Sequence, residues 1–252
     1  IRADSIGAIL GNGLYKQAVL HDISLDIAAG EWTSIVGPNG AGKTTVFNII
    51  SGFYCADGGK IIFNTEDVSK LNAAQVNHRG MARTFQNIRL FKSLTVLENV
   101  LMAMQQKRHN GTMADWFHSL FNTKKHKEIE STLYTEAIEL LKIFNLDEDA
   151  QELAGSLSYG SQRKLEIVRA LATKPMLLML DEPAAGMNHQ ETEELNKLIR
   201  FIKERFQLTI LLIEHDMKLV MNICDRIVVL NRGLKIADGL PKEIKALPEV
   251  IE

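Results

Sequence analysis

The residues with the clearest chemical meaning form a glycine-rich stretch that runs from Gly37 to Thr44. Its sequence, Gly-Pro-Asn-Gly-Ala-Gly-Lys-Thr, fits the pattern G-x-x-x-x-G-K-[ST]. Glycines let the backbone wrap around an anion, so that successive N–H groups and the positive end of a following helix point at phosphate oxygens. Lys43 would place its charge on the β- and γ-phosphates, and Thr44 its hydroxyl on Mg²⁺. The predicted nucleotide-binding residues are Gly37, Pro38, Asn39, Gly40, Ala41, Gly42, Lys43, Thr44 and Thr45.

Two adjacent carboxylates follow the apolar run Met176–Leu180, which predicts a buried strand. Open parallel sheets bind ligands at the carboxyl ends of their strands, so Asp181 and Glu182 would stand at a ligand site. Phosphoryl transfer needs an in-line nucleophile and neutralisation of charge. Asp181 would therefore hold Mg²⁺, directly or through water, and Glu182 would orient the attacking water. Acids after an apolar strand are also common loop residues, and the upstream phosphate loop is what favours the catalytic interpretation.

Two further candidates carry a weaker signal. His215 follows the apolar run Leu208–Ile213 and would reach the same sheet edge, where it could contact the γ-phosphate and the water. A lone histidine is more often structural. Tyr15 is one of two aromatic residues before the phosphate loop. It could stack on adenine or simply pack within a β-hairpin.

These residues lie in a chain whose predicted strands alternate with helices. The first thirty residues alternate between apolar and polar side chains in short stretches, which predicts a small antiparallel sheet. Trp32–Val36 predicts a strand that leads through the phosphate loop into a helix. Residues 88–157 are predicted to be mostly helical, because their apolar residues recur at helical spacing. Thr95 and Glu98 form a capping-box pair within this segment.

After the helical segment the alternation of strands and helices resumes. The later continuous apolar runs fit parallel strands that are buried on both faces. A turn at Asn231–Gly233 leads into a terminal hairpin, and a helix is expected to begin near Pro241. We therefore expect an α/β fold in a single domain. This domain, residues 1–252, would comprise a parallel-sheet core with an N-terminal antiparallel β subdomain (residues 1–87 and 158–252) and an inserted α-helical subdomain (residues 88–157).

The composition of the 252-residue chain is that of a soluble globular protein, with 46% apolar and 24% charged residues. The chain has 29 Lys and Arg residues against 31 Asp and Glu residues, so it lacks the net positive charge that is typical of proteins that bind bulk nucleic acid. The longest apolar runs are far shorter than the about 20 residues of a membrane-spanning helix, so the chain is not expected to cross a bilayer by itself. Two cysteines are too few for a disulfide framework, which favours a reducing compartment. Residues 107–127 are locally basic, and a solvated loop is the favoured interpretation.

Together with Gln86 and the pentapeptide Leu157–Ser161, these motifs resemble those of the nucleotide-binding subunit of ATP-binding-cassette (ABC) transporters over essentially the whole chain. In that family a five-residue signature precedes the Asp-Glu pair by about twenty residues, as it does here. The finer resemblance is to the subunits of branched-chain amino acid importers. It rests on the Tyr-Gly variant of the signature and on the runs Ala82–Phe91, Asp181–Asn188 and Ile213–Met221.

The resemblance implies a P-loop NTPase (RecA-like) core and an ATPase that works as a head-to-tail dimer with the same or a paralogous chain. Two ATP molecules would lie at the interface, each between the phosphate loop of one subunit and the signature of the other. Ser158, Gly160 and Ser161 would bind ATP across that interface, and Gln86 and His215 would sense its γ-phosphate. The implied catalytic residues are Glu182, His215 and Gln86, and the implied Mg²⁺ ligands are Thr44, Gln86 and Asp181.

The resemblance also implies partners and a location. Integral membrane permease subunits would contact the chain near Gln86 and the helical subdomain. A substrate-binding protein would act indirectly, and no nucleic acid is expected. The chain would lie peripherally on the cytoplasmic face of the plasma (inner) membrane. Hydrolysis of ATP would open the dimer and drive import through differential affinity for two states.

Three positions depart from the usual family pattern. Tyr159 and Ser161 stand where the wider family has glycine and glutamine, and Asn188 stands where it has aspartate. The cargo also stays open, since another substrate, such as lipopolysaccharide for export, would be distinguished only by the membrane partner. A non-transport ABC ATPase of DNA repair or translation would be favoured by tandem cassettes or a long coiled-coil insertion, and the sequence shows neither. A nucleotide-binding switch without hydrolysis is disfavoured by Glu182.

Overall fold

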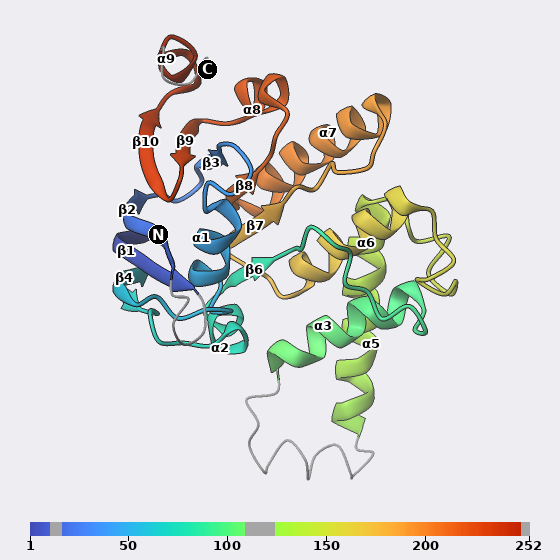
Figure 1. Ribbon diagram of the computed structural model, residues 1–252. Coiled ribbons are helices and arrows are strands. Elements are labelled where there is room, and N and C mark those ends of the chain that lie inside the picture. Colours follow the sequence, from blue (N-terminus) through green and yellow to red (C-terminus); the bar gives the residue numbers. More distant parts are fainter. Residues whose placement is uncertain (11–16, 109–123, 248–252) are drawn as a thin grey trace.

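The computed structural model describes residues 1–10, 17–108 and 124–247. Figure 1 shows an antiparallel sheet near the N-terminus, a central sheet, and a group of helices to one side. The strands are β1 Arg2–Leu10, β2 Gln17–Asp26, β3 Trp32–Val36, β4 Gly58–Phe63, β5 Glu66–Asp67, β6 Met81–Arg83, β7 Leu177–Asp181, β8 Thr209–Ile213, β9 Arg226–Asn231 and β10 Leu234–Gly239. The helices are α1 Lys43–Ile50, α2 Ala73–His78, α3 Val96–Arg108, α5 Lys124–Ile143, α6 Tyr159–Ala172, α7 His189–Phe206, α8 Met217–Ile223 and α9 Pro241–Lys245.

The antiparallel sheet near the N-terminus has the strand order β2-β1-β4-β5. The predicted small antiparallel sheet is confirmed, and two strands from residues 58–67 extend it. Ile6 and Ile23 of this sheet and Phe47 of α1 are completely buried in one core, which also receives one face of the central sheet. The helix that follows the phosphate loop is therefore fixed from two sides.

The central sheet has the order β10-β9-β3-β8-β7-β6, in which only the pair of β9 and β10 is antiparallel. Successive side chains of a strand point to opposite faces. Leu178 and Leu180 of β7 therefore pack in the core shared with the helices, and Leu177 and Met179 in the core shared with α1. Because β3, β6, β7 and β8 run in the same direction, their carboxyl ends meet at one edge of the sheet.

The strand before the acid pair begins and ends one residue later than predicted. It covers Leu177–Asp181, and its pairing with β6 and β8 begins at Leu177, whereas Met176 is 47% exposed. Asp181 instead pairs with Ile213 of β8. The shift places Asp181 within the sheet and leaves Glu182 as the first residue of the loop.

Helices α3, α5 and α6 pack against one another beside the central sheet (Figure 1). The predicted capping box is confirmed at the start of α3. Thr95 N donates to Glu98 Oε2 at 2.7 Å, and Glu98 N donates to Thr95 Oγ1 at 3.1 Å. Leu141 of α5 and Leu165 of α6 are completely buried in their shared core. The limits of the helical subdomain, residues 88–157, stay a prediction.

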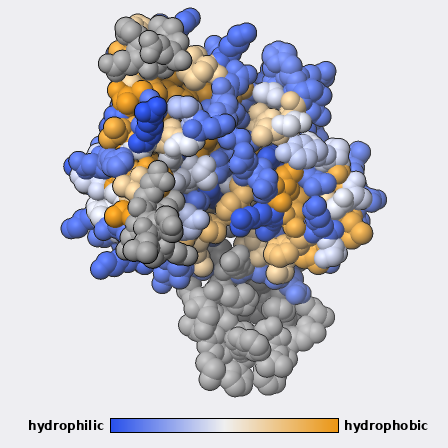
Figure 2. Space-filling model, in the orientation of Figure 1, coloured by the Kyte–Doolittle hydropathy of each residue, from blue (hydrophilic) through white to orange (hydrophobic). Residues whose placement is uncertain are grey.

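The face of the molecule in Figure 2 is mostly hydrophilic, and its apolar patches are separated by polar side chains. Among the helices that the structure describes, none is both long enough and apolar enough to cross a bilayer. Tyr15 and residues 109–123 of the basic segment lie outside the described residues.

Candidate functional site

The phosphate loop connects the end of β3 to the start of α1, as predicted. Gly37 has a φ of 149°, and a Cβ built on it would lie 2.0 Å from the carbonyl oxygen of Leu230, so only glycine fits there. Gly42 is the N-cap of α1, with a φ of 100°, and it has no side chain that could accept a hydrogen bond from the first turn. The first turn also contains no acidic residue. The N–H groups of that turn therefore offer an anion-binding site. The other predicted residues of the loop and the first turn are Pro38, Asn39, Gly40, Ala41, Thr44 and Thr45.

The side chain of Lys43 folds back over the loop that precedes it. The residue is 6% exposed, and its Nζ donates to the carbonyl oxygens of Gly37 at 2.8 Å and Pro38 at 3.0 Å. Burial lowers the pKa of Lys43, and the carboxylates of Glu182 and Asp181 oppose this shift. The lysine charge is therefore close enough to the acid pair to interact with both carboxylates.

Glu182 is the meeting point of the predicted catalytic residues. Its φ of 47° is unusual for a residue with a side chain, and its N–H donates to the carbonyl oxygen of Ile213 at 3.0 Å. Gln86 Nε2 donates to Glu182 Oε2 at 2.9 Å, and His215 Nε2 lies 2.8 Å from Glu182 Oε1. The Glu182 side chain is 17% exposed. Two residues from separate stretches of the sequence thus contact the carboxylate of Glu182.

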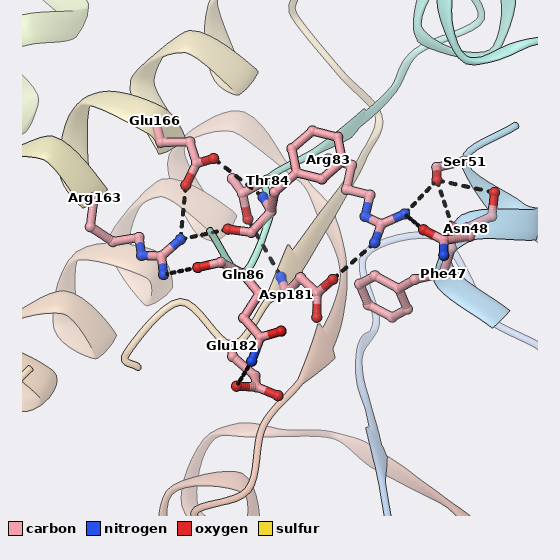
Figure 3. A network of polar contacts seen from close by, with 11 residues as sticks. Phe47, Asn48, Ser51, Arg83, Thr84, Gln86, Arg163, Glu166, Asp181 and Glu182 are labelled. Atoms are coloured by element: carbon pink, nitrogen blue, oxygen red, sulfur yellow. Dashed lines mark hydrogen bonds and ion pairs between the residues drawn. The ribbon is translucent and has the colours of Figure 1, made fainter. Parts of the chain in front are cut away.

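Asp181 is held by a buried arginine that the sequence motifs did not mark as functional. Arg83, at the end of β6, donates from Nη2 to Asp181 Oδ2 at 2.9 Å, and the two side chains are 5% and 4% exposed. Its Nη1 donates to Asn48 Oδ1 at 2.8 Å and to Ser51 Oγ at 2.9 Å (Figure 3). The guanidinium carbon lies 5.1 to 5.7 Å from the ring centres of Phe85, Phe47 and Phe53.

The pKa of Arg83 is lowered in this setting. Burial lowers the pKa of the Arg83 guanidinium, and the hydrogen bond from Arg83 to Asp181 raises it. An arginine stays protonated in proteins even so. The available sequence signal was only a basic residue at position 83 after Met81 and Ala82, and its partner follows only from the neighbouring positions of β6 and β7.

Glu214 supports the turn around Glu182 from the end of β8. Its Oε1 accepts the N–H of Ala184 and its Oε2 accepts the N–H of His215, both at 3.2 Å. The residue is 6% exposed, and burial raises the pKa of its carboxyl group. Glu214 is thus a second buried acid at the site, and it binds the backbone on both sides of the Glu182–His215 contact.

The predicted Mg²⁺ ligands are oxygen donors of the kind that this ion prefers. Thr44 offers a hydroxyl, Asp181 a carboxylate and Gln86 an amide oxygen. Mg²⁺ is usually bound through one or two carboxylates together with phosphate oxygens, so a carboxylate at the sheet edge of a phosphate loop fits the ion. Within the described ranges, no group of three or more His, Cys, Asp or Glu side chains is arranged to hold a metal ion by itself.

The signature residues lie on a different element, at the start of α6. Ser158 is the N-cap, and its Oγ accepts the N–H of Ser161 at 3.2 Å and donates to Ser161 Oγ at 3.0 Å. A Cβ built on Gly160 would lie 3.6 Å from Glu191 Oε1, which is an ordinary contact. Among the residues that the structure places, no hydrogen bond joins these three to the phosphate loop of the same chain. One chain therefore presents the phosphate loop and the signature separately.

Asn188, the third departure from the family pattern, caps α7. Its Oδ1 accepts the N–H of Glu191 at 2.9 Å, and Glu191 Oε2 accepts the N–H of Asn188 at 2.9 Å. Asparagine and aspartate are about equally good N-caps. The asparagine therefore leaves the start of α7 intact.

Known proteins resemble this chain over nearly its whole length. The family model for ABC transporters matches residues 20–185. The chain is 46% identical to the high-affinity branched-chain amino acid transport ATP-binding protein BraF of Pseudomonas aeruginosa, over 92% of this chain and 90% of that protein. It is 44% identical to the protein LivG of Escherichia coli K12, which carries the same description, over 95% of this chain and 94% of LivG. The crystal structure of a nucleotide-free ATP-binding cassette from an ABC transporter matches the fold with a TM-score of 0.81 at 32% identity, covering 100% of this chain and 96% of that one. The chain therefore belongs to the ABC transporter family.

Proposed function

We propose that this chain is the ATP-hydrolysing subunit of an importer for branched-chain or related amino acids. The observation that carries hydrolysis is the meeting of Glu182, Gln86 and His215 at the sheet edge that also presents the phosphate loop. The cargo is supported by BraF and LivG, which are described as branched-chain amino acid transport ATP-binding proteins and match more than nine-tenths of this chain.

The phosphate loop is the proposed binding site for the phosphates of ATP. The N–H groups of the loop and of the first turn of α1 would bind phosphate oxygens, and Lys43 would exchange its two loop carbonyl contacts for phosphate contacts. Tyr15 stays the proposed contact of the adenine ring. Mg²⁺, held by Thr44, Asp181 and Gln86, would neutralise negative charge on the β- and γ-phosphates.

Glu182 is the proposed catalytic residue because both of its carboxylate oxygens are held by neighbours. Gln86 binds Oε2 and His215 contacts Oε1. A carboxylate fixed in this way can accept a hydrogen bond from a water molecule and aim that water at the γ-phosphate. Gln86 and His215 would sense the triphosphate if either exchanged its contact with Glu182 for one with the γ-phosphate.

A second subunit, the same or a paralogous chain, is proposed to complete each site. Ser158, Gly160 and Ser161 begin a helix of 14 residues, and the N-terminus of a helix binds anions. Since nothing in the chain's own packing requires glycine at position 160, its small size is free to serve a close approach by a ligand. The signature of one subunit would then bind the γ-phosphate held by the other, and hydrolysis would weaken the interface.

The permease is proposed to dock in a groove between the core and the helices. The groove has a volume of about 470 Å³ and is lined by residues of α2, of α6 and of the segment after β6. Phe53 and Phe91 are 45% and 47% exposed there, and the guanidinium of Arg169 lies 4.9 Å from the ring centre of Phe91. Because the segment after β6 also carries Gln86, a permease helix in this groove could respond to the ATP site. The chain would thus be peripheral on the cytoplasmic face of the membrane, and the substrate-binding protein would act through the permease.

The variant Glu182→Gln tests hydrolysis, since glutamine keeps the size of the side chain and removes its charge. Phosphate release should fall by at least about 100-fold, the usual contribution of a positioned acid or base. ATP-dependent dimers should persist in gel filtration. The control Glu193→Gln changes an exposed glutamate of α7 and should hydrolyse ATP normally. Turnover at the wild-type rate in Glu182→Gln would show that the assignment is wrong.

Capture of the tagged chain from membranes tests the partners and the cargo. We expect integral membrane subunits to be purified with it, and the reconstituted complex to take up leucine, isoleucine or valine into liposomes when ATP is supplied. ATP-driven movement of a lipid, or an active ATPase that retains no integral partner, would refute the proposed cargo.

A further inference from the structure

Tyr159, which interrupts the glycines of the family signature, contacts the loop that follows Glu182. Its OH donates to the carbonyl oxygen of Ala185 at 3.0 Å. Gly186 lies against its ring with a φ of 81°, and a Cβ built there would be 3.2 Å from Tyr159 Cε1. The N–H of Ala185 in turn donates to the carbonyl oxygen of Glu182 at 3.1 Å. One phenol therefore joins the first turn of α6 to the turn that carries Glu182.

Arg163, one turn further along α6, holds the segment that carries Gln86 (Figure 3). It is completely buried, and it donates from Nη1 to the carbonyl oxygen of Phe85 at 2.6 Å and from Nη2 to that of Gln86 at 2.7 Å. Its ion-pair partner Glu166, at 2.9 Å, accepts the N–H groups of Phe85 and Arg89 at 3.3 Å. Arg163 and Glu166 of α6 thus bind carbonyl and N–H groups of the backbone between Phe85 and Arg89.

The two sets of contacts are joined and converge on Glu182. Arg163 Nη2 donates to the OH of Tyr159 at 3.3 Å. Tyr159 is connected to the main chain of Glu182 through Ala185. Arg163 is connected to the carboxylate of Glu182 through Gln86, whose Nε2 donates to it. Ser158, on the same turn, is exposed and bonds to Ser161 instead. Tyr159, which is 46% exposed, and the buried Arg163 therefore hold the chain's own loops, whereas the exposed cap Ser158 bonds to Ser161 of its own helix.

We propose that Tyr159 and Arg163 are positioning residues that align this chain's own Glu182 and Gln86. The inference rests on the proposed function, in which Ser158 and Gly160 of the same helix bind the partner's ATP. Helix α6 then acts on both ATP sites of the dimer, in trans through Ser158 and Gly160 and in cis through Tyr159 and Arg163. Closure around the partner's ATP sets the geometry at the chain's own Glu182 by this route.

The variant Tyr159→Phe tests the proposal because it removes only the hydroxyl. We expect kcat for ATP hydrolysis to fall roughly three- to tenfold, the effect of one lost hydrogen bond. The affinity for a non-hydrolysable ATP analogue and the Tm should match those of Tyr134→Phe, which removes an exposed hydroxyl from α5. Arg163→Lys keeps the positive charge beside Glu166, but a lysine lacks the planar pair of donors that binds the carbonyl oxygens of Phe85 and Gln86. This variant should therefore also lower kcat. A kcat for Tyr159→Phe equal to that of the control would overturn the proposal.

Mixed dimers separate an effect in cis from an effect in trans. Two full-length copies with different affinity tags, one of which carries Glu182→Gln, retain one competent site. Tyr159→Phe in the chain that keeps Glu182 should slow the remaining turnover, and the same change in the Glu182→Gln chain should not. The reverse result would show that Tyr159 acts on the partner's ATP and would overturn the proposal.

Amide hydrogen exchange tests the contact with no need for turnover. Residues 184–187 should exchange faster in Tyr159→Phe than in wild type or Tyr134→Phe, because the hydrogen bond to Ala185 is lost. Unchanged exchange would refute this inference even if the wild-type chain hydrolyses ATP. A wild-type chain that hydrolyses no ATP, alone or with its membrane partners, would refute the proposed function whatever the exchange shows.

Discussion

Removing the charge of Arg83 should destabilise the fold much more than removing a surface charge. In Arg83→Met the buried carboxylate of Asp181 loses its ion-pair partner, and Asn48 Oδ1 and Ser51 Oγ lose a donor. Breaking a buried ion pair by removing one partner costs about 3 to 5 kcal/mol. For a chain of this size each kcal/mol shifts Tm by about 2 to 4 °C, so we expect Tm to fall by roughly 6 to 20 °C.

Thermal unfolding measures this loss, and a double-mutant cycle assigns it to the pair. In Arg83→Met/Asp181→Asn the unpaired negative charge is gone, so the double variant should lose roughly 1 to 3 kcal/mol less than the two single variants together. Arg83→Lys keeps the charge with fewer directed donors and should fall between wild type and Arg83→Met. Arg200→Met, on the exposed face of α7, is the matched control and should stay within about 0.5 kcal/mol of wild type.

Two outcomes would contradict this account of Arg83. A loss below about 1 kcal/mol in Arg83→Met would mean that this pair contributes no more than an exposed salt bridge. Additive losses in the cycle would mean that Arg83 stabilises the fold through Asn48, Ser51 and the surrounding phenylalanine rings, with no share from Asp181.

Two further predictions concern the cap of α7 and the cysteines. Asn188→Ala removes the oxygen that accepts the N–H of Glu191 and should cost about 1 kcal/mol in thermal unfolding, whereas Asn188→Asp should be close to neutral. Equal losses in the two variants would contradict the capping role. A thiol reagent at neutral pH should modify the exposed Cys55 and spare Cys224 until the chain unfolds, because burial raises the pKa of Cys224 to about 12. Rapid modification of both thiols in the native chain would contradict this assignment.

The parts of the site that were predictable from the sequence have physical causes within a few residues of chain. Gly37 and Gly42 occupy backbone positions with positive φ and close neighbours, so their spacing already describes a strand, a loop and a helix start. The capping box of Thr95 and Glu98 likewise joins residues three positions apart. The meeting of Glu182 and His215 was predictable for a different reason, because parallel strands bring their carboxyl ends to one edge.

Contacts that depend on strand order were not predictable in the same way. Arg83 and Asp181 are 98 residues apart and meet only because β6 and β7 are neighbours in the sheet. Strand β6 has three residues, too few for a periodic pattern, and β4 begins with two glycines that hide its alternation. The strands that sequence periodicity missed are therefore the short or glycine-containing ones, and the buried arginine was missed with them.

Tyr159 shows why a departure from a family motif needs a structure to be interpreted. Considered as a sequence position, it replaces a glycine in a segment expected to contact ATP. Its phenol turns instead to Ala185 and Gly186 of its own chain, and Gly160 beside it stays without a side chain. The tyrosine therefore adds a hydrogen bond to the chain's own loop and leaves the neighbouring glycine available to a ligand. Since a glycine at position 159 could make no such bond, α6 should hold the loop after Glu182 less firmly in cassettes that carry glycine there.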